Sequence, residues 1–377
     1  MKGLVFMANR PLHRFAALLL ALAMSLAACA TESDTGTDTG TGTATGSGSA
    51  SATGTADDSA ATDADGGYAY ASNVDAHRLV VNDICEVNEL LDADEIDFAA
   101  VSELYENGKN SVNSDGSVRS IGGFAASEDR NHGLDDYYGT ATPLDDFVRA
   151  ALEGTGQFEG ESDAVRRQGV QKGIQNQVMV AWVVHELNSA LDKAADGDFD
   201  PVGGAPHNWD EAWAFYYGAD RDCAPYVTAE KRADDFGTNN EEQTALANAA
   251  ILQAMNDGRD ALVAEDAEGA QEAADEVLRN LAIIYSQATV KYATVAADDI
   301  ANGDEDAARV HQAEGYAFFR VIENLLADAG ADVETVNAIL ELSNEPAAGG
   351  GGDEVRAALA PAWEELGISE EDIGTLQ

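Results

Sequence analysis

Apolar side chains recur every three or four residues through most of this chain, which is the period of an amphipathic α-helix. Segment 173–194 shows this period before a helix end at Asp196-Gly197, with apolar residues at Val178, Ala181, Trp182, Leu187 and Leu191. The segments with the same period are 241–258, 270–300, 304–329 and 332–342. Strand-like alternation is scarce, so the pattern predicts an all-α helical bundle.

Two short stretches indicate an internal duplication. Residues 211–216 (EAWAFY) and 314–319 (EGYAFF) share the order acid, small, aromatic, Ala, Phe, aromatic, and each follows a long helical segment that ends in Gly-Asp. We therefore predict two related helical units packed about a pseudo-twofold axis, in which Glu211 and Glu314 are counterparts.

The first 28 residues have the parts of an export signal. Lys2, Arg10 and Arg14 are positive, the apolar run 15–26 is too short to span a bilayer, and small residues lead to Cys29. This order is typical of a bacterial lipoprotein signal peptide, which is cleaved before the cysteine so that the cysteine can carry acyl chains. Each buried CH₂ contributes roughly 0.8 kcal/mol, so two or three chains anchor a protein to a membrane.

We therefore predict a lipid-anchored protein of the cell envelope that faces the periplasm or the cell exterior. An ordinary secretory signal, the alternative, would also export the chain.

The composition of the chain after the signal peptide divides it into three segments. Residues 29–67 are mostly Thr, Gly, Ser, Ala and Asp, which predict a disordered tether. Residues 68–345 form the predicted helical domain, and 346–377 a Gly-rich joint with a short helix that docks through Leu359, Trp363 and Leu366.

The charge of the chain restricts its partners and its surroundings. Asp and Glu number 69 against 21 Lys and Arg, which gives a formal net charge of −48, and the acids are spread through every segment. Their repulsion opposes compaction at low salt, whereas molar salt shortens the Debye length to about 3 Å. This composition predicts the surface of a halophilic protein. It also excludes nucleic acid as a partner, because no basic patch could neutralise phosphates.

The chain contains three cysteines, and Cys29 is the one that the predicted lipid modification would use. Cys85 and Cys223 then remain as a pair in an oxidising compartment, where a disulfide between them is the favoured outcome. No CxxC spacing supports a cysteine metal site.

Histidine and acid spacings point to metal binding. His207, Asp210 and Glu211 stand at i, i+3 and i+4, and His311 and Glu314 stand at i and i+3, so each set lies on one helix face. Bundles hold di-iron centres with a Glu-x-x-His pair from each of two helices, and a pseudo-twofold axis would bring these two sets together. The mixed nitrogen and oxygen donors suit iron or another divalent metal. The alternative is that the histidines are structural.

A second candidate metal cluster lies at residues 131–139, where His132, Asp135 and Asp136 offer ligands and Tyr137 a phenolate. A loop anchored by aromatic residues explains the same stretch equally well. The aromatic residues of 209–217 are expected in the core, and His77 has no supporting neighbours. No GxSxG, HExxH or Gly-rich phosphate loop is present, so we predict no enzymatic activity.

The string HNWDEAWAFYYG at 207–218, with YENGKN at 105–110 and GIQNQ at 173–177, resembles the iron-assimilating, low-iron-inducible periplasmic proteins of green algae and their bacterial relatives. The resemblance covers residues 85–325 and implies an extracytoplasmic helical protein associated with iron uptake. The duplicated units are also distantly similar to imelysin-like lipoproteins, although Arg309 stands where that family has Gly. Neither resemblance assigns the iron ligands.

The sequence therefore predicts a surface-tethered metal-binding lipoprotein that captures iron or hands it to an uptake-system protein. The proposed ligands are His207, Glu211, His311 and Glu314, with Asp210 as a spare ligand or as a group that orients an imidazole. The competing hypothesis is an interaction module without metal, whose helical bundles bind a partner protein.

Overall fold

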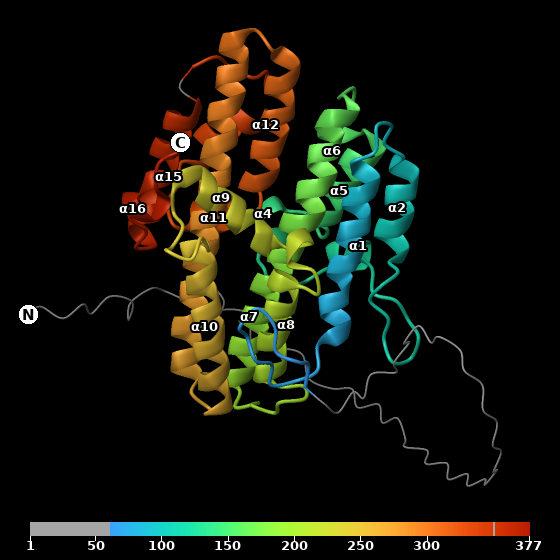
Figure 1. Cartoon of the computed structure of the whole chain (residues 1–377), viewed down its shortest axis with the longest axis vertical. Helices are drawn as coiled ribbons and strands as arrows, with labels where there is room; N and C mark the ends of the chain where they lie inside the picture. Colours follow the sequence, from blue (N-terminus) through green and yellow to red (C-terminus); the bar gives the residue numbers. More distant parts are fainter. Residues whose placement is uncertain (1–60, 350) are drawn as a thin grey trace, which may run out of the picture. The chain divides into compact units, whose positions relative to one another are not determined.

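The computed structural model describes residues 61–349 and 351–377 (Figure 1). The first helices are α1 (Asp75–Leu91), α2 (Phe98–Asn107), α3 (Ile121–Ala125), α4 (Leu134–Tyr138), α5 (Pro143–Glu153), α6 (Asp163–Lys172), α7 (Met179–Ala195) and α8 (Ala205–Tyr217), with the short helices η1 (Gly156–Phe158), η2 (Gly173–Val178) and η3 (Arg221–Cys223). The remaining helices are α9 (Pro225–Phe236), α10 (Leu246–Val263), α11 (Ala267–Asn302), α12 (Glu305–Phe319), α13 (Glu323–Asp328), α14 (Val333–Leu340), α15 (Gly351–Glu365) and α16 (Glu370–Ile373). The predicted signal peptide 1–28, the lipidation site Cys29 and residues 30–60 lie outside the described residues.

The prediction of an all-α fold is confirmed, since the described residues contain no β-strand. Two helical hairpins organise the bundle. In the first, α6, η2 and α7 follow one another without a break and α7 packs against α8; in the second, the long α11 packs against α12 (Figure 1). Each hairpin joins a long helical run to a shorter helix that carries one of the repeated motifs. The pseudo-twofold relation between them stays a prediction.

The π-helix η2 coincides with the GIQNQ stretch and joins several helices through buried amides. Asn176 Oδ1 accepts hydrogen bonds from Thr228 Oγ1 at 2.8 Å and from Tyr285 Oη at 2.9 Å, which ties η2 to α9 and α11. Gln177 Nε2 donates to the carbonyl oxygen of Ala317 in α12 at 2.9 Å. π-helical turns are rare and often occur at functional sites, so η2 is a candidate position for a functional site.

The aromatic residues of α8 lie in the core, as expected: Trp209, Trp213 and Phe215 are fully buried. The indole nitrogen of Trp209 donates to the carbonyl oxygen of Met255 in α10 at 2.8 Å. A Cβ at Gly258 would stand 2.0 Å from the Trp209 ring, so only glycine allows α8 and α10 to approach this closely. This packing fixes the α8 helix, on which the candidate site is built.

Both ends of the described chain pack onto the bundle. Thr62 is buried and its hydroxyl accepts from the backbone N–H of Val74, while Asp65 pairs with Arg78, so ordered contacts begin before Tyr68. At the other end, α15 covers α11, with Leu359 and Trp363 buried.

The glycines at the start of α15 allow the contact between α15 and α11. A Cβ at Gly352 would lie 1.8 Å from Thr294 Oγ1, so the missing side chain lets the two helices touch. The Trp363 indole nitrogen then donates to Ser286 Oγ at 2.9 Å.

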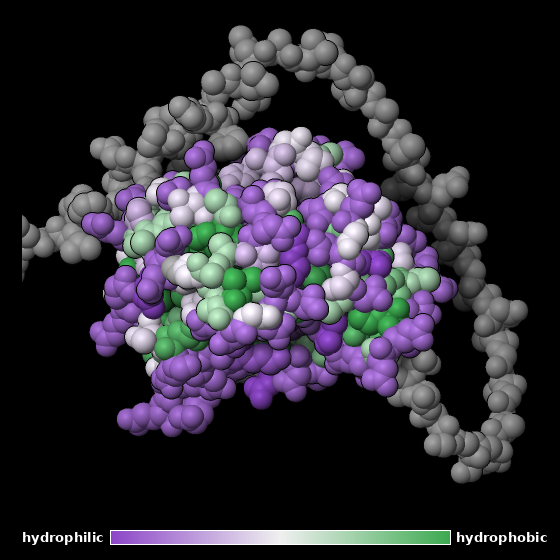
Figure 2. Space-filling view, turned by 90° about the horizontal axis from the view of Figure 1, so that it is seen from above, coloured by the Kyte–Doolittle hydropathy of each residue, from purple (hydrophilic) through white to green (hydrophobic). Residues whose placement is uncertain are grey.

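The surface is mainly hydrophilic. The face in Figure 2 shows small hydrophobic areas separated by hydrophilic ones. Among the described residues, the exposed large hydrophobics are Val112, Val118, Val202, Leu246 and Val263.

We expect this surface to make stability depend on salt. Lowering NaCl from about 1 M to about 0.1 M lengthens the Debye length from about 3 to about 10 Å and exposes the net charge of −48 to its own repulsion. The melting temperature, followed by circular dichroism, should fall by about 10 °C or more. An unchanged melting temperature would contradict the halophilic interpretation.

Candidate metal centre

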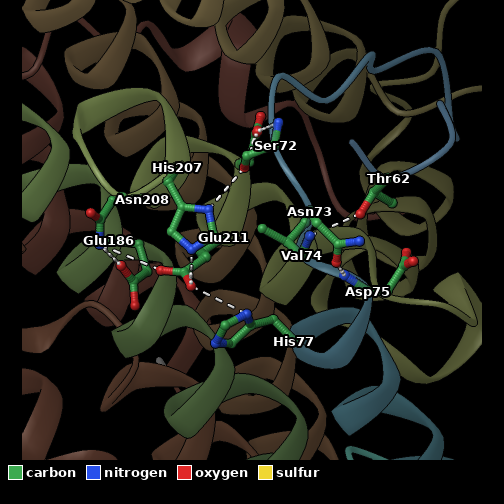
Figure 3. A network of polar contacts seen from close by, with 12 residues as sticks. Thr62, Ser72, Asn73, Val74, Asp75, His77, Glu186, His207, Asn208 and Glu211 are labelled. Atoms are coloured by element: carbon green, nitrogen blue, oxygen red, sulfur yellow. Dashed lines mark hydrogen bonds and ion pairs between the residues drawn. The ribbon is translucent and has the colours of Figure 1, made fainter. Parts of the chain in front are cut away.

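The carboxylate of Glu211 lies between two imidazoles that come from different helices. His207 precedes it by one turn on α8 and places Nε2 3.1 Å from Glu211 Oε1, while His77 of α1 places Nδ1 3.2 Å from the same oxygen (Figure 3). Glu211 is buried, and both histidines are partly exposed. The centre is therefore enclosed by protein but open to solvent on the histidine side.

A chain of hydrogen bonds fixes the orientation of His207. The Ser72 hydroxyl donates to Asp210 Oδ2 at 2.7 Å, so its oxygen accepts from His207 Nδ1 at 2.9 Å. The Asp210 carboxylate also accepts from Tyr68 Oη at 2.6 Å. With its proton on Nδ1, the imidazole turns Nε2 toward Glu211, where either a second proton or a cation must lie between them.

Asp210 therefore occupies the position of an orienting group rather than that of a ligand. Its carboxylate is surrounded by donors from the segment before α1 and reaches the candidate centre only through Ser72.

Glu186 of α7 adds a second buried carboxylate. The side-chain amide of Asn208 donates to both Glu186 and Glu211, which holds the two acids against each other. Burial, and then the charge of Glu211, raise the pKa of Glu186 far above its usual range. Burial by itself would raise the pKa of Glu211, but the hydrogen bond from His207 and the positive charge of that imidazole outweigh it, so this pKa lies below its usual range. One proton is thus held on Glu186 at neutral pH.

The two imidazoles differ in charge. The hydrogen bond to Glu211 raises the pKa of His207, whereas burial lowers the pKa of His77 to about 4. The His77 ring also packs edge-on against Phe215, with 5.7 Å between ring centroids. The resting centre therefore contains one carboxylate anion, one protonated acid, one imidazolium and one neutral imidazole.

This donor set matches a borderline divalent cation. Two adjacent ligands about 2.1 Å from an octahedral ion are about 3.0 Å apart, close to the two distances between Glu211 Oε1 and its imidazoles. His77, His207 and Glu211 do not, however, bring three ligand atoms within 4.8 Å of one another. Binding a shared ion would require the imidazoles to close around it.

The structure gives the other two predicted ligands separate partners. His311 Nδ1 lies 2.6 Å from Asp299 Oδ2, and Glu314 Oε1 lies 3.1 Å from Lys172 Nζ. Neither is among the contacts of Glu211, so the four predicted residues are not brought into one cluster.

The residues of the second predicted metal cluster also have separate contacts. His132 is buried and its Nδ1 accepts the backbone N–H of Leu134 at 3.2 Å, while Asp135 Oδ1 lies 4.0 Å away. Tyr137 instead donates to Glu323 at 3.1 Å, as does the neighbouring Tyr138 at 2.6 Å. Asp136 is exposed. These contacts correspond to the anchored-loop alternative.

Within the described ranges, three potential ligands approach one another at Cys85, Asp220 and Cys223. These two cysteines are joined in a disulfide between α1 and η3, the pairing that the cysteine count favoured, so they offer no thiolate.

Sequence reasoning identified His207 and Glu211 but missed Glu186 and His77. The first pair is local on one helix, whereas His77 and Glu186 reach the site only because α1 and α7 pack beside α8. No spacing along the chain carries that information.

The fold and this centre describe an all-α protein with a histidine–carboxylate site on a helical hairpin. The chain belongs to the family of low iron-inducible periplasmic proteins, whose model (Fea1) matches residues 43–377. Searches of curated proteins and of solved structures return no significant match. Within the residues that the structure describes, no helix has both the length and the apolar character needed to cross a membrane.

Proposed function

We propose that this protein binds ferrous iron, or a similar divalent ion, at the Glu211 centre and delivers it to an uptake system of the cell envelope. Membership of a periplasmic family described by its induction at low iron supports the link to iron. The lipid anchor predicted at Cys29 would keep the captured ion near the membrane where uptake occurs.

The observation that carries this proposal is that Glu211 Oε1 faces two imidazole nitrogens. At rest, protons on His207 and Glu186 balance the charges of the centre. A divalent cation can replace those protons without changing the net charge, because the freed imidazole nitrogen and carboxylate become ligands. The partial exposure of both histidines gives an ion a path in and out, as capture and handover require.

Elemental analysis tests the proposal directly. The mature chain, kept in high salt, is incubated with Fe²⁺ under anaerobic conditions and freed of unbound metal. We expect about one iron per chain. No retained iron would favour the competing interaction module, in which the histidines have structural roles.

Iron affinity should rise with pH because binding releases protons. The hydrogen bond to Glu211 raises the pKa of His207, and burial raises the pKa of Glu186, so protons compete with the metal more strongly as pH falls. We expect the dissociation constant to increase by about ten- to a hundredfold for each pH unit lost between about 7.5 and 5.5. Calorimetry in buffers of different ionisation enthalpy should register one to two protons released. Equal affinity at both pH values would contradict this mechanism.

A further inference from the structure

A polar cavity of about 570 Å³ opens where α1, α6, η2, α9, α11 and α12 meet. It belongs to a different part of the bundle from the Glu211 centre, since none of the residues of that centre lines it. Four basic residues line it although the chain as a whole is strongly acidic: Arg167, Lys172, Lys231 and Arg232. The π-helix η2 contributes Gln175 and Asn176 to its wall.

Arg232 is the unusual residue of this cavity. It is 4% exposed, its Nη2 pairs with Asp235 at 2.9 Å, and its Nε and Nη1 have no hydrogen-bond partner among the described residues. A buried guanidinium with unpaired N–H groups is unfavourable unless an acceptor joins it, because each group has lost its hydration. These N–H groups are therefore suited to an anionic or polar acceptor.

The charges around Arg232 leave a local positive excess. Asp235 is shared between Arg232 and Lys291, whose Nζ lies 2.8 Å from the same carboxylate, and Glu314 neutralises Lys172. Three bases thus face two acids. One further negative charge beside Arg232 would balance this group of five side chains.

The other residues that line the cavity restrict the chemical class of its ligand. Lys172 lies 5.5 Å from the centroid of the Phe318 ring, and Arg232 lies 5.3 Å from that of Tyr292, so aromatic faces hold both cations in place. Side-chain amides and a hydroxyl form much of the remaining wall, which suits hydroxyl groups: Asn88, Gln171, Gln175, Asn176 and Thr228.

The rim carries exposed acids that would repel a multiply charged anion such as phosphate: Glu89, Asp92, Asp220 and Asp222. A ligand with a single negative charge is therefore favoured over one with two or three.

We propose that this cavity binds a small polyhydroxylated monocarboxylate, a sugar acid in chemical terms, with its carboxylate against Arg232 and its hydroxyls against the amide wall. Arginine is suited to this role because its planar N–H groups match a carboxylate. The volume is within the range of small-molecule sites.

Calorimetric titration of the mature chain tests the proposal, with gluconate as the probe and chloride held constant at high salt. We expect saturable binding of gluconate, at least tenfold weaker binding of acetate, phosphate and glucose, and at least a tenfold loss for Arg232→Gln. Asp235 keeps Lys291 as a partner in that variant, so no acid is left unpaired. Arg279→Gln on α11 is the matched control and should bind as the wild type, because Arg279 does not line the cavity.

Lys231→Gln keeps the test valid if Arg232→Gln does not fold. Lys231 is exposed and lines the cavity, so its loss should weaken gluconate binding about threefold and leave the melting temperature unchanged. Unchanged affinity in both variants, or no gluconate binding at all, would overturn the proposal. Acetate binding as tightly as gluconate would overturn the polyhydroxylated ligand, and tighter binding of phosphate would overturn the monocarboxylate. Iron binding at Glu211 should persist in every case.

Discussion

Replacing Glu211 by Gln should weaken Fe²⁺ binding by at least a hundredfold. The amide keeps the size of the side chain but removes the negative charge that faces both imidazoles. It also removes the charge that helps to keep Glu186 protonated. Changes to groups that merely orient a metal ligand cost ten- to a hundredfold, so loss of the central ligand should cost at least the upper end of that range. Anaerobic calorimetry at constant high salt measures the difference.

Glu314→Gln is the matched control for that variant. Glu314 occupies the corresponding position of the repeated motif but pairs with Lys172 rather than with an imidazole. We expect its iron affinity to stay within about threefold of the wild type. If both substitutions abolished iron binding equally, the single-centre proposal would fail and the two motifs would have to act together, as the sequence pattern first suggested. If neither had an effect, the metal would bind elsewhere.

Removing the disulfide should cause the largest loss of stability. Cys85 and Cys223 are separated by 138 residues, and the chain-entropy model assigns about 4.7 kcal/mol to closing a loop of about 100 residues. We expect Cys85→Ser with Cys223→Ser to lower the free energy of unfolding by about 2–5 kcal/mol, measured by urea unfolding in high salt. The link ties α1, which carries His77, to the segment after α8, so iron binding should also weaken.

A reductant supplies the control for the disulfide experiment. It should destabilise the wild type by a similar amount and leave the double variant unchanged. Equal unfolding curves for wild type and variant would show that helix packing alone positions α1.

Much of the fold was accessible from hydrophobic periodicity. The long helix predicted at 270–300 lies within α11, because apolar spacing marks the face that it buries. The segment predicted as one helix at 304–329 is divided in the structure into α12 and α13. The docked C-terminal helix was visible in Leu359 and Trp363, since large apolar residues after a Gly run need a surface to cover. Periodicity did not show η2, because a π-helix differs from an α-helix by one inserted residue and leaves no distinct pattern.

The candidate centre, like the fold, was only partly predictable from the sequence. The sequence by itself determined the helical class, the acidic surface, the pairing of Cys85 with Cys223 and the contact between His207 and Glu211, because each depends on composition or on neighbours within one helical turn. Only the tertiary structure decided that His77 and Glu186 complete that centre and that Glu314 faces Lys172. The physical reason is that the packing of α1, α6 and α7 determines these side-chain contacts. Packing in turn depends on the shapes of side chains that lie far apart in the sequence.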